Sequence, residues 1–351
     1  MNINNCKQWT DDIDEVIFEL PELNILVNER IMITGCTGLI CSSIIDILIR
    51  WNELHNEKIE IIASGRNESK IRERFEPYYK EEWFEINYYD AASLNTNMDV
   101  KCDYIIHGAS NASPSNIVKE PVETMLSNIL GINTLLDYAK ENGVKRVVYI
   151  SSSEVYGKKG GNEPFRINDY GFIDLLNSRN SYSVGKQAAE TLCISYFEEY
   201  GVDSVIVRPG HIYGPTANST DNRVSSSWAY DVARGKNIVM KSDGAQIRSY
   251  CYCLDCATAI LKVLFYGKSA QAYNISNSKS VISIREMANI LAESGNVQML
   301  YELPTSEEKK GFNPMQNSSL DATELVNLGW RGIFDAKRGI NHTVSILKEI
   351  L

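Results

Sequence analysis

The chain has 351 residues, of which 44% are hydrophobic, and its formal net charge is -10. This length and apolar content suit a folded protein with ordinary buried cores. The acidic balance argues against a nucleic-acid partner, because phosphate backbones select for clustered Lys and Arg. No apolar run is long enough to cross a membrane, and the polar first residues do not resemble a secretory signal, so we expect a cytoplasmic protein without a membrane partner.

The first half of the chain alternates short apolar strands with helix-length segments. The expected strands are Arg30–Thr34, Ile59–Ala63, Trp83–Tyr88, Tyr104–His107, Arg146–Ser151 and Ser204–Arg208. The main helices between them are expected at Leu39–Arg50, Pro121–Glu141 and Ser183–Tyr200. The strands are apolar without alternation, as in strands buried on both faces of a parallel sheet. The pattern predicts an α/β fold with a Rossmann-type doubly wound parallel sheet.

Beyond Pro209 the sequence is less regular, with Gly, Asn and Ser punctuation and helical patterns at Ile284–Ser294 and from Ala336 onward. We therefore expect a smaller C-terminal α/β substrate lobe. Residues 1–208 would hold an N-terminal extension (about 1–28) and the dinucleotide-binding domain, to which part of 236–262 returns. Residues 209–351 would form mainly the substrate lobe.

Three of the eight cysteines, Cys251, Cys253 and Cys256, lie close together in the sequence. A metal site would need a further pair of ligands that the sequence does not offer nearby. We therefore expect ordinary buried thiols and no metal.

A glycine-containing turn follows the first strand directly, in the segment TGCTGLICS. At such a strand-to-helix turn, backbone amides and the helix dipole can hold a pyrophosphate. The third position of the glycine spacing is Cys41, which is small enough for the helix to approach. The expected cofactor-binding residues of this turn are Gly35, Thr37, Gly38, Leu39 and Ile40.

The end of the second strand leaves the type of dinucleotide open. An acid for the adenosine ribose is usual there, but this chain has Arg66, which could face a 2′-phosphate or stack on adenine. NAD is the expected cofactor, and Arg66 keeps NADP open. Asp90, after the third strand, is placed to reach the adenine, and Ala109 and Ser110, after the fourth, are placed to pass beneath the phosphates and ribose.

Tyr182 and Lys186 are four residues apart and fall on one face of a predicted helix. Lys186 can lower the pKa of the phenol and hold a nicotinamide ribose, so that Tyr182 acts as a general base on a sugar hydroxyl. Such pairs also occur on ordinary helices. Here the fifth strand ends nearby in Ser152, Ser153 and Glu154, whose side chains complete a plausible site at the carboxyl edge of the sheet.

Together these motifs resemble the extended short-chain dehydrogenase/reductases that modify nucleotide sugars, the NAD-dependent epimerase/dehydratase family. The matching segments, in the expected order, are Gly35/Gly38, HGASNASP, ISSSEVYG, Tyr182/Lys186, RPGHIYGP, IRSYCYCLD, YNISNS and LGW. Within the family, Ser152, Ser153 and Glu154 are most similar to the motif of the UDP-glucuronate decarboxylases, or UDP-xylose synthases.

The resemblance implies roles for these residues. Tyr182 would be the base at O4, Lys186 its modifier, Ser152 a hydrogen-bond partner, and Glu154 a group near C5. The residues implied in binding a nucleoside-diphosphate sugar are Ser113, Arg179, His211, Arg223 and Arg248. His211 stands where most relatives carry Asn, which indicates an unusual substrate. The family also implies a homodimer built through two long helices of each subunit.

The predicted reaction oxidises the sugar at C4, and the ketone then assists the loss of a C5 carboxylate as carbon dioxide. A 4,6-dehydratase is the second reading, although Ser153 replaces the aspartate that protonates the leaving hydroxyl in those enzymes. A 4-epimerase is the third, and it would leave Glu154 without a role. A protein that senses nucleotide sugars or NADP without turnover is the alternative of another class, which the intact Tyr182 and Lys186 disfavour.

Overall fold

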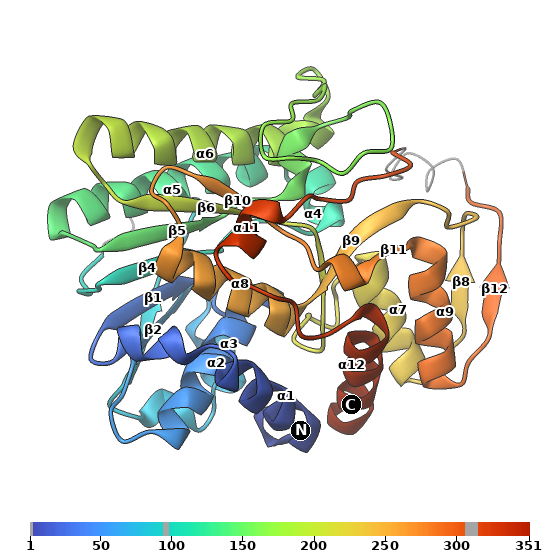
Figure 1. Cartoon of the computed structure of the whole chain (residues 1–351), viewed down its shortest axis with the longest axis horizontal. Helices are drawn as coiled ribbons and strands as arrows, with labels where there is room; N and C mark the ends of the chain where they lie inside the picture. The colour runs from blue at the N-terminus through green and yellow to red at the C-terminus, as the bar shows by residue number, and fades with distance from the viewer. Residues whose placement is uncertain (1–2, 94–97, 306–314) are drawn as a thin grey trace.

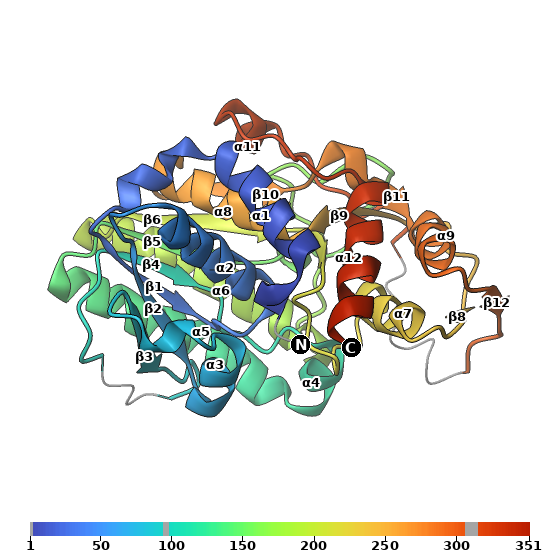
Figure 2. The same cartoon turned by 90° about the horizontal axis from the view of Figure 1, so that it is seen from below.

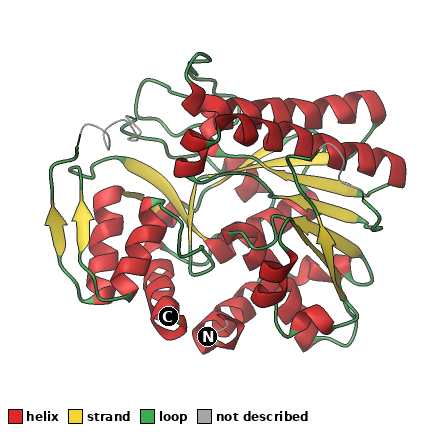
Figure 3. Cartoon of the chain, turned by 180° about the vertical axis from the view of Figure 1, so that it is seen from behind, coloured by secondary structure: helices red, strands yellow, loops and turns green. Residues whose placement is uncertain are grey.

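A seven-stranded parallel sheet forms the centre of the larger part of the molecule (Figures 1 and 3). The computed structural model describes residues 3–93, 98–305 and 315–351. The strand order is β10-β6-β5-β4-β1-β2-β3. These strands are β1 (Arg30–Thr34), β2 (Glu60–Gly65), β3 (Phe84–Tyr88), β4 (Tyr104–His107), β5 (Arg146–Ile150), β6 (Ser204–Pro209) and β10 (Ala272–Ile275). The predicted Rossmann-type α/β class is confirmed.

Helices cover both faces of this sheet, as Figure 1 shows. On one face lie α5 (Pro121–Asn142) and α6 (Ser181–Tyr200), and on the other lie α2 (Leu39–Leu54) and α8 (Cys253–Tyr266). Neighbouring β1 residues enter different cores: Met32 packs with α5, whereas Ile31 packs with α2 and α8. Both faces of each strand are therefore buried, which is why the strands are apolar without alternation.

The smaller lobe contains two further sheets, visible away from the large sheet in Figure 3. One has the order β11-β9-β7 and the other pairs β12 with β8. Its elements are β7 (His211–Tyr213), α7 (Val224–Ala233), β8 (Ile238–Met240), β9 (Ile247–Tyr252), β11 (Val281–Ser283), α9 (Ile284–Gly295), β12 (Met299–Tyr301) and α12 (Ala336–Ile350). Between β9 and β11 the chain returns to the large sheet through α8 and β10.

Short elements complete the chain and carry several of the predicted site residues. The short helices are α3 (Glu68–Arg74), α4 (Pro114–Lys119) and α11 (Thr323–Asn327), and the 3-10 turns are Ile3–Asn5, Pro21–Leu26, Tyr78–Lys80, η4 (Ser153–Tyr156), η5 (Ser178–Asn180) and Ser278–Ser280. Of these, η4 follows β5 and η5 directly precedes α6, so the two turns bring Glu154 and Arg179 to the start of α6.

The N-terminal extension forms a helix, α1 (Lys7–Phe18), for which the sequence analysis assigned no element. Figure 2 shows α1 between α2 and α12, with the two chain ends close together. Trp9 is fully buried and donates to Asp46 of α2 at 3.1 Å. Asp12 accepts from the hydroxyl of Tyr252 at 3.1 Å and lies 2.9 Å from Nδ1 of His342 in α12. The extension therefore joins the large sheet's helical layer to the smaller lobe.

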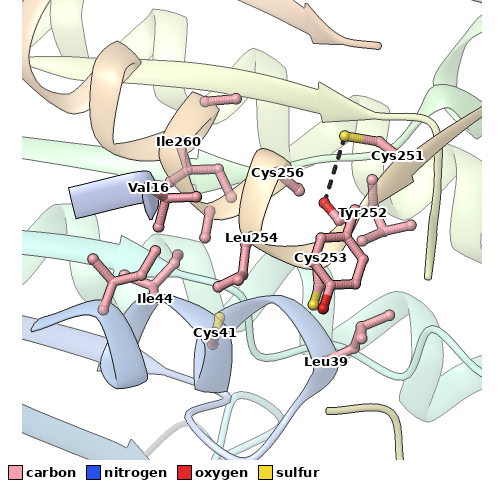
Figure 4. Close-up of a cluster of buried hydrophobic side chains, with 14 of the residues drawn as sticks. Val16, Leu39, Cys41, Ile44, Cys251, Tyr252, Cys253, Leu254, Cys256 and Ile260 are labelled. Carbon is pink, nitrogen blue, oxygen red and sulfur yellow. Dashed lines mark hydrogen bonds between the residues drawn. The ribbon is translucent and has the colours of Figure 1, made fainter. Parts of the chain in front are cut away.

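Sulfur atoms gather where the N-termini of α2 and α8 meet (Figure 4). Cys41 lies opposite Cys253 and Cys256, and all three are buried with Leu39 and Leu254 around them. Within residues 3–93, 98–305 and 315–351 no group of three or more His, Cys, Asp or Glu side chains is arranged to hold a metal ion. In the same ranges no helix is long and apolar enough to span a bilayer.

Replacing Trp9 with Ala should lower the free energy of unfolding by about 3–5 kcal/mol, because it empties a fully buried indole site and leaves Asp46 without that donor. Urea denaturation followed by circular dichroism measures the change. Phe18 lies on the same helix with 83% of its surface exposed, so Phe18→Ala is the matched control and should have little effect. Equal stabilities for the two variants would show that α1 is not anchored as described.

Candidate active site

The turn after β1 is shaped for close approach of a ligand to the backbone. Gly35 has a φ of +70°, and a Cβ added there would lie 2.8 Å from the nitrogen of Ala109, so only glycine fits. Gly38 is the N-cap of α2 and has no side chain to accept from the first amides of this helix. These amides are therefore not occupied by a capping side chain. The turn fits the pyrophosphate of a dinucleotide, which the backbone amides of Gly38, Leu39 and Ile40, with Thr37 beside them, would hold.

Cys41 and Gly108 fit against each other beneath this turn. A Cβ added to Gly108 would overlap Sγ of Cys41. The side chain at the third position of the glycine spacing is therefore accommodated by a glycine at the end of β4. Helix α2 keeps its approach to the sheet although Cys41 replaces the usual glycine.

The residues predicted to reach the rest of the cofactor follow β2, β3 and β4. Arg66 is exposed directly after β2 and forms no ion pair with another described residue. Asp90 lies two residues beyond β3, and its carboxylate accepts from the amide of Ala92 at 3.0 Å. After β4, the amide of Ala109 points to Thr34 Oγ1 at 3.4 Å, and Ser110 donates to Asn128 at 2.9 Å. These positions are all at the carboxyl edge of the sheet.

Tyr182 and Lys186 lie in the first turns of α6 and are 7% and 3% exposed. Lys186 Nζ donates to the carbonyl of Ile150, the last residue of β5, at 2.7 Å. It also lies 4.6 Å from the ring centroid of Tyr149 and 5.8 Å from that of Tyr182. The Lys186 side chain is thus held between the end of β5 and the ring of Tyr182.

Burial changes the acidity of both groups. It lowers the pKa of Lys186 to about 7, although the Glu190 carboxylate acts in the opposite direction. Burial and the nearby Glu154 carboxylate raise the pKa of Tyr182 to about 12, although a hydrogen bond from Ser152 opposes them. In this structure the phenol therefore keeps its proton at neutral pH, which differs from the lowered pKa expected from the spacing of Tyr182 and Lys186, because burial outweighs the nearby positive charges.

The predicted Ser152, Ser153 and Glu154 follow β5 in or next to η4. Ser152 Oγ accepts from the amide of Glu154 at 3.2 Å and so caps this turn. The carboxylate of Glu154 accepts from Ser183 Oγ at 3.3 Å and lies 3.6 Å from a guanidinium nitrogen of Arg179. Glu154 therefore faces the start of α6, where its partner Ser183 is the residue next to Tyr182.

A second group of predicted residues comes from the smaller lobe. Arg248 is buried, and its Nη1 donates to the carbonyls of Ile247 at 2.8 Å and Met315 at 3.1 Å. Burial, with Arg248 and Arg223 nearby, lowers the pKa of His211 to about 4, so its imidazole is neutral. His211 Nδ1 is buried and has no hydrogen-bond partner among the described residues. The structure thus gathers a neutral imidazole and two cations.

Arg223 lies near both the residues around Tyr182 and the residues around His211. Its charge acts on Tyr182 as well as on His211, and its Nε donates to Asp221 at 2.9 Å. The adjacent Asn222 accepts from Ser113 at 3.2 Å, which places the predicted Ser113 beside the same segment.

Sequence reasoning missed the polar residues behind the site. His107 is buried at the end of β4, lies 2.7 Å from Thr34 Oγ1, and stacks on Tyr149 with the ring centroids 5.8 Å apart. Burial and the charge of Lys186 lower its pKa to about 3, so this imidazole is neutral. Glu190, one helical turn beyond Lys186, was also missed, although its spacing on the same helix face was a usable signal.

With this geometry in place, comparison with known proteins decides the family. The model described as "NAD dependent epimerase/dehydratase family" matches residues 31–276. The chain belongs to this family. Its fold, its nature as an enzyme and NAD as its cofactor are thereby confirmed.

Among curated relatives, UDP-glucuronic acid decarboxylase 3 from Arabidopsis thaliana is 31% identical over 313 residues, which cover 89% of this chain and 87% of the relative. UDP-glucuronic acid decarboxylase 6 from the same plant is 31% identical over 250 residues, covering 71% and 70%. The family resemblance drawn from the motifs is confirmed by these matches.

Solved structures share the fold at lower identity. UDP-glucose 4-epimerase from Thermotoga maritima superposes with a TM-score of 0.77 at 21% identity, covering 92% of this chain and 99% of that one. UDP-glucuronic acid 4-epimerase from Bacillus cereus gives 0.75 at 20% identity, covering 92% and 100%.

Replacing Gly108 with Ala should lower the free energy of unfolding by about 1–3 kcal/mol and weaken NAD binding, because the new methyl group collides with Cys41 and pushes α2 from the sheet. Urea denaturation and calorimetric titration with NAD measure the two effects. The double variant with Cys41→Ala should recover most of both, while Cys41→Ala alone should change NAD affinity little. Simple additivity in this cycle would contradict the fit of Cys41 against Gly108.

Proposed function

We propose that this enzyme decarboxylates a UDP-glucuronate-like nucleotide sugar through a 4-keto intermediate. The observation that carries the proposal is the pairing of Glu154 with Arg179 directly beside Tyr182. Ser153 offers only a hydroxyl at the position where a dehydration would need an acid. Relatives named as UDP-glucuronic acid decarboxylases support the same assignment.

The charges near Tyr182 suit a substrate that is anionic at both ends. Arg179 and Arg223 both act on the Tyr182 phenol, and Arg248 lies with Arg223 near His211. A diphosphate accounts for the cations of the smaller lobe, since Arg suits paired phosphate oxygens. Arg179 belongs to η5 and not to the smaller lobe, so we assign it to the sugar carboxylate.

The turn after β1 and Lys186 would hold NAD, whose chemistry there would be reversible acceptance of the C4 hydride. The Tyr182 phenolate, stabilised by the charge of Lys186, takes the proton from O4 and becomes the neutral phenol. Ser152, which hydrogen-bonds Tyr182, is placed to bond the same oxygen. When the C5 carboxylate leaves as carbon dioxide, its bonding electrons move toward the C4 ketone oxygen, where Tyr182 and Ser152 stabilise the negative charge. Water oriented by Glu154 would then supply the proton that C5 takes up.

We also propose a homodimer formed through α5 and α6. These two helices pack together on one face of the large sheet and carry exposed apolar side chains, among them Val122, Leu126 and Phe197. Exposed apolar residues on a helix pair are suited to a subunit contact.

Purified protein incubated with UDP-glucuronate should yield a product lighter by one carbon dioxide, with no net consumption of NAD. Mass spectrometry of a panel of UDP-, dTDP-, GDP- and CDP-sugars separates this from loss of water, expected of a dehydratase, and from unchanged mass, expected of an epimerase. Tyr182→Phe should abolish turnover while NAD still binds, because only the proton acceptor is lost. Turnover that survives in Tyr182→Phe would overturn the assignment of the base, and no decarboxylation of UDP-glucuronate would overturn the reaction.

Replacing Arg179 with Leu should weaken binding of UDP-glucuronate about tenfold to a hundredfold and change binding of UDP-glucose much less, because a hydrogen bond to a charged group is worth about 1.5–3 kcal/mol. Calorimetric titration of Tyr182→Phe protein, which does not consume the ligand, measures both affinities. The control is Arg72→Leu, which removes an exposed arginine paired with Glu68 on α3. An equal loss for both sugars would show that Arg179 does not select the carboxylate.

A further inference from the structure

Glu190 of α6 is a buried acid that the reaction described above does not use. Its side chain lies behind the site, one helical turn after Lys186. A buried carboxylate is costly unless it is paired, so its partners indicate what it is retained for.

Three hydrogen bonds satisfy this carboxylate. Glu190 Oε1 accepts from Ser151 Oγ at 2.5 Å and from Arg208 Nε at 3.0 Å, and Oε2 accepts from Arg208 Nη2 at 2.6 Å. Ser151 directly precedes Ser152 at the end of β5, and Arg208 belongs to β6. The carboxylate therefore joins α6 to the ends of two neighbouring strands.

Arg208 extends the connection to the turn that carries Glu154. Its Nη1 donates to the hydroxyl of Tyr156 in η4 at 3.0 Å and to the carbonyl of Ile167 at 2.9 Å. The Tyr156 hydroxyl in turn donates to Asn274 of β10 at 2.6 Å. The buried Glu190–Arg208 ion pair thus binds the chain on both sides of the Ser152–Glu154 segment. Glu190 binds Ser151 before it, and Arg208 binds Tyr156 after it.

The charge of Glu190 also acts on Lys186. The ammonium of Lys186 donates to the carbonyl of Ile150, next to Ser151, so both helix residues hold the same strand end. Burial lowers the pKa of Lys186 and favours its neutral amine, whereas the Glu190 carboxylate favours the ammonium. Without this anion the cation needed beside Tyr182 would be lost at lower pH.

We propose that Glu190 is a positioning residue of the active site, which keeps Lys186 cationic and fixes the end of β5 from which Ser152 and Glu154 project. This role rests on the proposed function only through the use of Lys186 beside the cofactor and the phenol. Glu190 itself touches neither substrate nor reacting atoms, so it acts through Lys186 and Ser151.

The test is the pH dependence of NAD binding by the whole protein without any sugar, measured by calorimetric titration. The Lys186 ammonium would donate a stronger, charge-assisted hydrogen bond to the cofactor ribose than the neutral amine, so affinity should fall as pH rises through the pKa of about 7. Glu190→Gln removes the anion and should move the midpoint to lower pH by about one to three units. Glu198→Gln, at an exposed position of the same helix, is the matched control and should keep the original midpoint.

Two further variants keep the test decisive. If Glu190→Gln unfolds because Arg208 is left as an unpaired buried cation, the double variant with Arg208→Gln removes both charges, and the lower midpoint is again expected. Ser151→Ala removes one hydrogen bond and leaves the carboxylate, so its midpoint should equal that of the unchanged protein. An unshifted midpoint in Glu190→Gln or in the double variant, or an equal shift in Ser151→Ala, would overturn the proposal. Absence of decarboxylation would leave this pH shift measurable, so failures of the two proposals are distinguishable.

Discussion

The buried ammonium of Lys186 is the constraint around which the site is arranged. A cation that is 3% exposed must be compensated by its surroundings, and here the compensation comes from a strand-end carbonyl, a tyrosine ring and the Glu190 carboxylate. Each of these partners belongs to α6 or to the end of β5. The need to stabilise one charge therefore fixes the distance between the helix that carries Tyr182 and the strand that leads to Ser152.

The parallel sheet makes this arrangement available, because its strands all end at the same edge. The turn after β1, the Gly108–Ser110 segment after β4 and η4 after β5 consequently lie next to one another. The close approach of Gly35 to Ala109 and the fit of Cys41 against Gly108 show how little space separates these segments. Glycine is needed on one side of each contact, so the positions constrain each other across the sheet.

The sequence was sufficient for the features that depend on local pattern. Apolar runs and helical periodicity located β1, β4 and α6 to within two residues, and the spacing of Tyr182 and Lys186 identified the helix face that bears the phenol. The second strand was placed slightly early, because Ser64 and Gly65 extend it although they are not strand formers. The end of this strand is decided by its pairing with β1 and β3. Because those strands are distant in the sequence, the local pattern could not predict it.

Features that depend on contacts between distant parts of the chain could not be predicted from local sequence patterns. Helix α1 has an acidic, polar composition, and it becomes a helix of the core because Trp9 and Asp12 meet partners far along the chain. The Glu190–Arg208 pair likewise joins α6 to β6, and although the spacing of Glu190 from Lys186 is a signal, its partner on β6 is not indicated by either segment. The roles of Arg179 and Arg223 in substrate binding stay predictions.

His211 shows how the structure changes the meaning of a departure from the family pattern. In the sequence, this histidine in place of the usual asparagine indicates an unusual substrate. Burial beside two arginines keeps its imidazole uncharged. A neutral imidazole offers one donor and one acceptor, as an amide also offers both kinds of group. The substitution therefore preserves the polarity and charge of the position, and the unusual substrate that it indicated stays a prediction.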